Sequence, residues 1–433
     1  MEFDDEMHVW EFPPVSTYLE AAPEFKKKLA EEVILRKGSM QTAANFLNQM
    51  SVRYGIQSRY GANNICDWKN GRMKNGERKQ TLIPLWVVLE MIDATSNSEK
   101  EKYARLNSFE KYVISYRELE RGTPVLADKL PIMINPEFDS IIFHLMGDGC
   151  WGGKGKLSSY RQKDKIGRDN FISKIRNVFG WFKVDEYESE MELKVCIPRV
   201  IAKIIEEHYD LKSASEKKRV PPQIMSKGKK NKLAGLVGFI VDEGHIGDAI
   251  EIYQSNKELL EDLRLICKEL GYKCSDVVLK AKAGEQKHKA DHYRLRISLN
   301  ASEKLYADIK ELTKEYPTCG LAQKQESLDT IVKRRAMKKG KGQNGITKAK
   351  IAEILQKGPA TVKHLKKELF IGGQTICEHL NQMETEKQVE KFGKAKNSIV
   401  WILARNQSIS SVKASCFLED SSTAEEQAVL QAR

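Results

Sequence analysis

The chain has 433 residues, and this length predicts about two to four folded units, each with its own core. Its formal net charge is +12, from 72 Lys and Arg against 60 Asp and Glu. Such an excess favours a polyanionic partner, because neutralised phosphates release counterions. Nucleic acid is the first expectation, and an anionic membrane surface is the rival.

A membrane-embedded protein is not expected. No apolar run approaches the ~20 residues that a membrane span needs, and the N-terminus begins with the acidic residues MEFDDE. The eight cysteines are scattered, without a CxxC pair or Cys/His ligand spacing. This excludes a predicted disulfide framework or zinc site and favours reduced thiols. We therefore expect a soluble cytoplasmic protein.

After a polar leader over residues 1–22, the segment 23–95 has the pattern of a small helical domain. Apolar residues recur at helical spacing from Phe25 to Ile34, a second short helix follows Gly38, and a third ends near Gly71 in the letters DWKNG. The segment resembles the repressor-type helix-turn-helix, whose third helix commonly ends in a similar stretch. The resemblance implies a recognition helix in the major groove. The candidate DNA-binding residues are Trp68, Lys69 and Arg72. The alternative is a small helical bundle with a basic face.

The segment 346–404 shows the order helix, turn, helix, turn, helix and two β-rich runs. This order resembles the winged helix-turn-helix family, which implies DNA binding, although a winged helix can also bind protein. Candidate contacts lie in the third helix and in a basic wing suited to phosphates. They are Gln374, Thr375, Lys391, Lys394 and Lys396.

Three segments have no predicted fold of their own. Residues 96–130 are charged and helix-prone and are interpreted as a connector. Residues 319–345 form a basic, glycine-punctuated linker, which either lies on phosphates or is simply solvated. Residues 405–433 are Ser-rich with acidic patches and are expected to be a disordered tail.

An internal repeat is the strongest pattern in the chain. Over residues 138–210, the motif IIFHLMGDG is followed by strand-, helix-, strand-, strand- and helix-like runs. Over residues 231–314, the motif LVGFIVDEG is followed by the same order. Each half is therefore predicted as α-β-β-α-β-β-α, and the fold class as α+β with antiparallel sheets.

The two motif endings, Asp148-Gly149 and Glu243-Gly244, resemble the LAGLIDADG family of homing endonucleases over residues 131–318. The resemblance implies a monomeric, pseudo-symmetric core with saddle-shaped sheets. Ala234 and Gly238 lie one helical turn apart, so another helix can approach closely on that face. Phe143 departs from this pattern, because close crossing usually needs a small residue there.

If the two motif helices pack together, Asp148 and Glu243 converge. Two repelling carboxylates favour a divalent cation bound by hard oxygen ligands, and Mg²⁺ is the expected metal. The backbone carbonyls of Gly147 and Asp242 complete the predicted ligand set. Such ions polarise a phosphodiester and stabilise the leaving oxygen.

Aligning the two halves indicates further candidates. Lys194 and Arg296 precede the closing helices, where the family places a basic side chain near the scissile phosphate. Gln162 and Gln254 end equivalent strands and are candidates to position the attacking water. For all four, the alternative is a surface residue that touches the DNA backbone. His144 is expected to be a packed interface residue rather than a ligand.

The predicted DNA-facing sheet surfaces carry basic residues, which are either duplex contacts or a solvated face. They are Lys154, Lys156, Arg161, Lys280, Lys282 and Lys287.

The paired acids favour a site-specific, metal-dependent endonuclease of double-stranded DNA. The alternative is a transcriptional regulator built on a core that has lost cleavage activity, which the helix-turn-helix-like segments fit very well. An RNA-splicing maturase is a third and weaker alternative, and the absence of a splicing-type Cys start or Asn end argues against an embedded intein.

Overall fold

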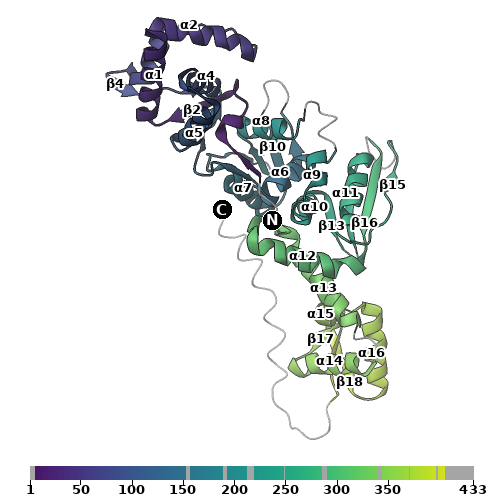
Figure 1. Cartoon of the computed structure of the whole chain (residues 1–433). Coiled ribbons are helices and arrows are strands. Elements are labelled where there is room, and N and C mark those ends of the chain that lie inside the picture. The colour runs from purple at the N-terminus through teal and green to yellow at the C-terminus, as the bar shows by residue number, and fades with distance from the viewer. Residues whose placement is uncertain are drawn as a thin grey trace. The chain divides into compact units, whose positions relative to one another are not determined.

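Helices and small antiparallel sheets alternate along the chain (Figure 1), and the predicted α+β class is confirmed. The protein is represented by a computed structural model with two compact units, Met1–Val332 and Lys333–Arg433. The described residues are 5–152, 157–188, 193–211, 219–247, 249–284, 290–339, 344–369, 371–395 and 398–404.

The N-terminal part of the first unit contains both helices and strands. The helix α1 ends at the left-handed Gly38, and Ser39 caps the next helix by accepting the Thr42 N–H at 3.1 Å. The helices are α1 Pro23–Lys37, α2 Met40–Met50, α3 Ala62–Asn70, α4 Leu85–Thr95 and α5 Glu99–Glu110. The strands are β1 Asp5–Met7, β2 Thr17–Ala21, β3 Arg72–Lys74, β4 Glu77–Lys79, β5 Ile83–Pro84, β6 Val113–Glu118, β7 Val125–Leu126 and β8 Ile132–Ile134.

These strands correct the expectation of an all-α N-terminal region with a polar leader and a connector. The sheet order is β5-β2-β6-β7, so strands from segments 1–22 and 96–130 form its centre. Leu19 pairs with Tyr116 and both side chains are fully buried. The two strands lie almost 100 residues apart, and short strands with distant partners leave little local pattern. Strand β1 likewise pairs with β8.

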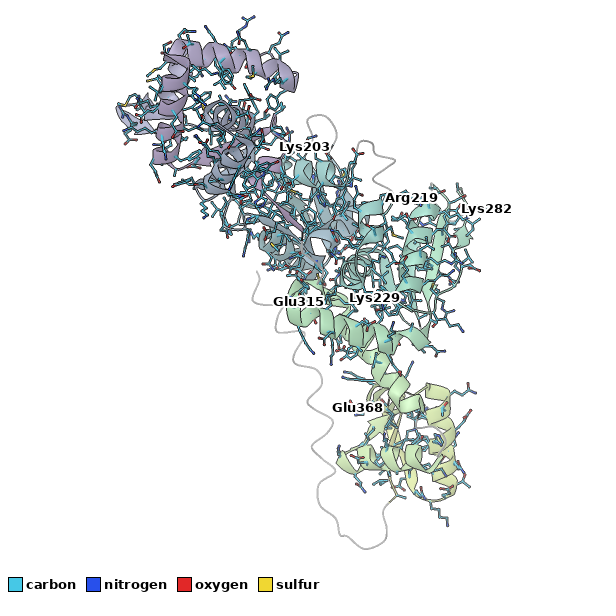
Figure 2. All side chains as sticks on the ribbon, in the orientation of Figure 1. Lys203, Arg219, Lys229, Lys282, Glu315 and Glu368 are labelled. Atoms are coloured by element: carbon cyan, nitrogen blue, oxygen red, sulfur yellow. The ribbon has the colours of Figure 1, made fainter. Side chains whose placement is uncertain are left out.

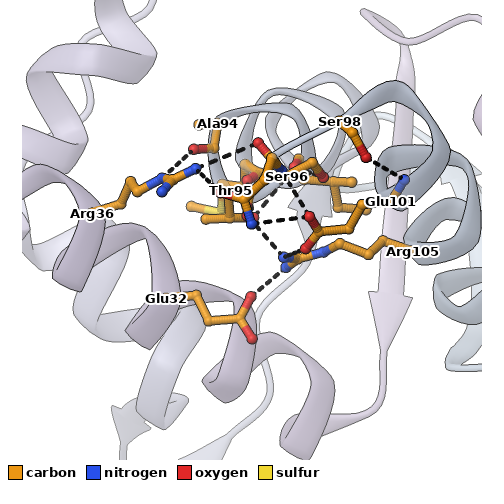
Figure 3. A network of polar contacts seen from close by, with 11 residues as sticks. Glu32, Arg36, Ala94, Thr95, Ser96, Ser98, Glu101 and Arg105 are labelled. Carbon is orange, nitrogen blue, oxygen red and sulfur yellow. Dashed lines mark hydrogen bonds and ion pairs between the residues drawn. The ribbon is translucent and has the colours of Figure 1, made fainter.

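Arginines join three helices of this region (Figure 3). Arg36 of α1 donates to the carbonyl oxygen of Ala94 at 3.2 Å and to the Asn97 side chain at 2.9 Å. Arg105 of α5 donates to the Thr95 carbonyl at 3.2 Å and pairs with Glu32. These contacts satisfy carbonyl groups at the C-terminal end of α4, which the helix itself leaves without partners.

Two successive series of elements follow, and both have the order α-β-β-α-β-β-α. The first comprises α6 Pro136–Met146, β9 Gly149–Cys150, β10 Ser159–Gln162, α7 Lys165–Phe179, β11 Asp185–Glu188, β12 Leu193–Cys196 and α8 Arg199–His208. The second comprises α10 Lys229–Glu243, β13 Gly244–Ile246, β14 Ile250–Gln254, α11 Lys257–Glu269, β15 Val278–Ala281, β16 His292–Ile297 and α12 Ser302–Glu315. The sheets have matching orders, β11-β12-β10-β9 and β15-β16-β14-β13. The short helix α9, Pro222–Ser226, lies between the two series.

Helices α6 and α10 pack against each other and are buried on nearly all sides. Ile141, Phe143, Leu236 and Phe239 are fully buried. The central turns of both helices are covered on all sides, which explains why neither has a solvent-facing polar stripe; polar residues of α6 such as Asp139 and His144 are themselves buried.

The segment after α12 is more ordered than the predicted linker. It forms two 3-10 turns, η5 Pro317–Cys319 and η6 Ala322–Lys324, and then α13, Gln325–Lys339. Leu321 and Leu328 are fully buried in the core of the first unit. Hydrophobic anchors therefore hold residues 319–332 against that core, although the basic composition suggests solvation.

The second unit has its own core, centred on Ile351, Leu380 and Trp401. Its elements are α14 Asn344–Lys357, β17 Ala360–Thr361, α15 Val362–Leu369, α16 Gly373–Thr385, β18 Val389–Ala395 and β19 Ser398–Leu403. The sheet order is β17-β19-β18. The predicted tail, 405–433, lies outside the described residues. Among the helices of the described ranges, none combines the length and apolar character of a membrane crossing.

Candidate functional site

Two glycines of α10 let the motif helices approach closely. A Cβ atom at Gly235 would lie 2.2 Å from the Phe143 ring, and one at Gly238 would lie 2.8 Å from the Ser140 Oγ. Phe143 is thus accommodated because its partner position has no side chain. The bulky residue that departs from the motif pattern is therefore compatible with close packing of α6 and α10.

The crossing brings together three acids, Asp148, Asp242 and Glu243, which we call the acid centre. Burial first, and then the charge of Asp242, raise the pKa of Asp148 to about 6. Burial, followed by the charges of Asp148 and Asp242, raises the pKa of Glu243 to about 7. Like charges raise each other's pKa only when they lie close together, so these two carboxyl groups share one environment.

A glutamine from each half contacts the acid of the same half. The Gln162 Nε2 donates to Asp148 Oδ2 at 3.2 Å, and the Gln254 Nε2 donates to Glu243 Oε1 at 3.2 Å. The carbonyl oxygens of these amides accept backbone N–H groups, from Lys163 at 2.9 Å and Ser255 at 2.8 Å. In this arrangement each glutamine orients a carboxylate.

The side chain of Asp242 is a functional candidate that the sequence pattern does not indicate, because only the backbone carbonyl of this residue is predicted as a ligand. Its carboxylate is 0% exposed, accepts the Tyr160 OH at 2.6 Å, and lies 3.0 Å from His144 Nδ1. Lys174 Nζ lies 2.8 Å from His144 Nε2 and donates to Ser140 Oγ at 2.7 Å.

The hydrogen-bond directions in this network follow from its chemistry. Burial and the neighbouring Lys174 hold the pKa of His144 well below its usual range, so the ring is neutral. Lys174 can only donate, so Nε2 accepts and the proton is assigned to Nδ1, which donates to Asp242. Burial raises the pKa of Asp242 to about 8. His144 is thus a packed interface residue, in agreement with the prediction.

All the partners of Asp242 in this network come from the first half. The equivalent residue of the first motif is Gly147, where a Cβ atom would lie 2.8 Å from the Asp242 Cβ. The absent side chain makes room for Asp242. The acid centre is therefore asymmetric, with one additional carboxylate from α10.

Lys324 of η6 supplies a cation to the acid centre. Its Nζ donates to the carbonyl oxygens of Ile240 at 2.9 Å and Asp242 at 3.2 Å, and also to that of Gly244 at 2.5 Å. Its charge lowers the pKa values of Asp148, Asp242 and Glu243, against the larger effect of burial. Nothing in the local sequence indicates this role, because Lys324 lies about 80 residues after α10.

The strand register contradicts the predicted equivalence of Lys194 and Arg296. Lys194 lies opposite Arg161, one residue before Gln162, whereas Arg294 lies opposite Tyr253, one residue before Gln254. Arg294 is therefore the counterpart of Lys194. The similar letters ELKVCIP and RLRISLN suggest an alignment two residues out of step, which the pairing of strands does not follow.

In the central strands, the basic residues lie on the face opposite to Gln162 and Gln254. Arg161 is exposed and shares its face with Lys194, because directly opposed residues project to the same side. Arg296 lies 3.9 Å from Glu251 and is half exposed. Lys280 is exposed on β15, and Lys282 is exposed just after this outermost strand (Figure 2). Lys154, Lys156 and Lys287 lie outside the described residues.

The helix-turn-helix candidates divide between core and surface. Trp68 is only 5% exposed and donates from Nε1 to the Leu82 carbonyl at 3.1 Å, so it is a packing residue rather than a DNA contact. Lys69 pairs with Glu31 at 3.1 Å. Arg72 is exposed on β3.

In the second unit, Gln374 is exposed and Thr375 half-buried in the first turn of α16. Lys391 is exposed but pairs with Glu384 at 2.7 Å, and its ammonium lies 5.1 Å from the centre of the Trp401 ring. Lys394 is exposed on β18, whereas Lys396 lies outside the described residues. Of the two predicted wing lysines that the structure describes, Lys391 is thus paired and Lys394 is exposed.

The side chains of Asp148 and Glu243 fit a divalent cation better than the predicted backbone carbonyl of Asp242 does. Their hard carboxylate oxygens are half-buried and repel each other, a donor set that a divalent cation would stabilise. The carbonyl of Asp242, in contrast, accepts a hydrogen bond from Lys324. Within the described ranges, no group of three or more His, Cys, Asp or Glu side chains forms a metal site.

Comparisons with known proteins give partial similarities. No protein-family model matches the sequence, and no curated protein matches it. Mesophilic variants of the homing endonuclease I-DmoI are 20% identical, with a TM-score of 0.30, over 40% of this chain and 94% of theirs. I-DmoI in complex with DNA and Mn is 20% identical, with a TM-score of 0.29, over 40% of this chain and 95% of that one. The meganuclease I-SmaMI bound to uncleaveable DNA is 11% identical, with a TM-score of 0.28, over 48% of this chain and 90% of that one.

Proposed function

We propose that this chain is a site-specific endonuclease that hydrolyses double-stranded DNA at the acid centre with a divalent cation, in the manner of the LAGLIDADG family. One observation carries the proposal. Asp148 follows α6 by two residues, Glu243 is the last residue of α10, both are half-buried in one environment, and each accepts a hydrogen bond from an equivalent glutamine.

The chain's own residues define what this centre would do. Asp148 and Glu243 would hold the cation, because two neighbouring buried carboxylates are unfavourable without positive charge between them. When bound, Mg²⁺ would polarise the phosphodiester and stabilise charge on the leaving oxygen. Gln162 and Gln254 orient the acids, and the fixed Asp242 network holds α10 against the first half. Preorganised groups of this kind favour catalysis because they need little rearrangement.

Basic residues of the two sheets would align the duplex with this centre. Arg161 and Lys194 share one face of the first sheet, and Arg294, the counterpart of Lys194, is half-buried in the second sheet, where it pairs with Glu251 at 2.9 Å. The α1–α4 region would act as a helix-turn-helix module and the second unit as a winged helix. Their phosphate contacts would supply affinity and register, whereas base contacts would supply sequence choice.

A transcriptional regulator without cleavage activity is the second candidate, and Lys324 favours it. The ammonium of Lys324 interacts with the charges of Asp148, Asp242 and Glu243, and so neutralises part of the acid centre. Its hydrogen bonds to carbonyl groups at the end of α10 hold it in this position. A centre neutralised by its own lysine needs a divalent cation less. Such a protein would bind DNA through the same surfaces and leave it intact.

Cleavage of a randomised duplex library with Mg²⁺ or Mn²⁺ distinguishes the two candidates. We expect the wild type to cut, and Asp148→Asn or Glu243→Gln to lose at least about a hundredfold in rate, because metal-assisted charge stabilisation is worth several kcal/mol. Glu311→Gln is the matched control, because this glutamate is exposed on α12 and pairs with Lys314 rather than with a residue of the acid centre. Tight DNA binding without cleavage under either cation would reject the nuclease and support the regulator.

A further inference from the structure

A β-hairpin in the N-terminal region is built as an exposed basic arm. Strands β3 and β4 join through Asn75 and Gly76, whose φ angles are +54° and +80°. Two central residues with positive φ define the tight turn whose twist matches a hairpin, and Asn-Gly is its preferred sequence. The turn chemistry thus specifies this two-stranded ribbon, which we call the basic hairpin (residues 72–79).

The base of the basic hairpin is fixed to the helices. The Thr81 Oγ1 donates to the Asp67 carbonyl at 3.0 Å, and the Trp68 Nε1 donates to the Leu82 carbonyl at 3.1 Å. Lys26 of α1 is buried and donates to the Thr81 carbonyl at 2.7 Å. The ribbon therefore leaves α3 in a defined direction, which lowers the ordering cost of any later contact.

The strands of the basic hairpin, in contrast, contribute nothing to a core. Every residue from 72 to 80 is exposed, and Met73 has 60% of its surface in solvent. A two-stranded ribbon alone is marginally stable in water, and an exposed methionine adds no burial. An element with a fixed base and unburied strands is suited to contact a partner.

Its charges are arranged unfavourably for the isolated protein. Arg72 lies directly opposite Lys79 in the strand register, whereas Lys74 lies opposite Glu77. Like charges directly opposed across two strands repel each other, so the Arg72–Lys79 pair destabilises the ribbon. Within the described part of the chain, no ion pair or side-chain hydrogen bond is found for Arg72, Arg78 or Lys79. A polyanion would relieve this repulsion.

We propose that the basic hairpin is a phosphate-contacting arm for duplex DNA, which is separate from the acid centre and from the recognition helix. A two-stranded ribbon fits the width of a DNA groove, and cations on one face can reach phosphates independently of sequence. This inference rests on the proposed DNA partner but not on cleavage. It assigns Trp68 a positioning role at the base of the arm.

The test compares Arg72→Ala/Lys79→Ala with wild type in duplex binding by fluorescence anisotropy, with EDTA present so that no DNA is cut. We expect affinity to fall about tenfold for unrelated sequences alike, and the salt slope to decrease by about 2, one unit for each phosphate contact. The melting temperature should stay equal or rise, because the repelling pair is removed. Arg72→Lys/Lys79→Arg should retain wild-type binding.

Lys27→Ala/Lys100→Ala is the charge-matched control, because both lysines are exposed in the same region but outside the basic hairpin. If Arg72→Ala/Lys79→Ala bound DNA with wild-type affinity and salt slope, the arm would be rejected while the DNA-binding function stood. A wild type that bound vesicles of anionic phospholipid but no duplex would overturn the arm and the proposed function together. A loss of DNA binding in Arg72→Ala/Lys79→Ala, but not in Lys27→Ala/Lys100→Ala, supports the arm whether or not the protein cleaves DNA.

Discussion

The protonation of the acid centre links its residues to pH and to cation binding. Burial raises the pKa of Asp148 to about 6 and that of Glu243 to about 7, above the values near 4 of an unfolded chain. The folded state therefore holds protons more tightly than the unfolded state. As pH rises from about 4 through these values, the carboxyls ionise inside the fold and its stability falls.

A divalent cation should reverse this loss, because it and the protons compete for the same oxygens. We expect the melting temperature in EDTA to fall between pH 5 and pH 8, and added Mg²⁺ or Mn²⁺ to raise it more at pH 8 than at pH 5. At a hundredfold excess over its dissociation constant, a ligand adds about 2.7 kcal/mol to the free energy of unfolding. Thermal melts over this pH range measure both effects.

The double variant Asp148→Asn/Glu243→Gln is the control for the other titrating groups of the protein. It should lose the cation-dependent increase at pH 8 and show a smaller fall in stability with pH. An equal cation effect at pH 5 and pH 8, or one retained in this variant, would show that the cation binds elsewhere.

At the scale of elements, the close contact between α6 and α10 depends on glycines of α10, which have no side chain. Gly235→Ala should destabilise the first unit by about 1–3 kcal/mol, because the new Cβ would lie 2.2 Å from the buried Phe143 ring and the helices must separate. Chemical denaturation measures this change. Gly320→Ala is the matched control, because its Cβ would meet Thr313 at an ordinary 3.4 Å.

A double-mutant cycle isolates the Gly235–Phe143 contact. Phe143→Ala alone leaves a cavity, but together with Gly235→Ala it should cost less than the sum of the two single changes, because the added methyl group then enters that space. Strictly additive losses would show that the two residues do not restrict each other.

Local sequence patterns predict the helices and strands of this chain better than they predict which strands pair with each other. The two α-β-β-α-β-β-α series follow from helical spacing, turns and alternating strands, which are properties of neighbouring residues. Strand β2 is missed because β6, its main partner, is distant in the sequence. A short amphipathic strand gains its stability from such a partner.

The same reason separates the predicted from the missed residues of the acid centre. Asp148 and Glu243 can be predicted from the sequence because each lies at the end of a repeated motif. The role of Asp242 depends on Tyr160 and His144, which lie 82 and 98 residues away, and the role of Lys324 depends on a turn after α12. Buried polar groups require partners, but the sequence does not say which ones the fold supplies.

At the scale of the whole molecule, the two units have separate hydrophobic cores. The N-terminal region and the two α-β-β-α-β-β-α series share one continuous cluster, whereas residues from Ile351 to Trp401 form another. Independent cores predict independent folding, since each unit then buries enough apolar surface by itself.

The fragment 333–433 should therefore fold alone, with a helical circular dichroism spectrum and a cooperative thermal transition. Trp401, its only tryptophan, is 3% exposed and should show the emission of a buried indole. Leu380→Ala should cost about 2–5 kcal/mol and unfold much of the fragment, because Leu380 is fully buried in this small core. Gln374→Ala, an exposed position on the same helix, is the control and should leave the transition unchanged. A gradual transition with the emission of a solvent-exposed tryptophan would mean that this unit depends on the rest of the chain.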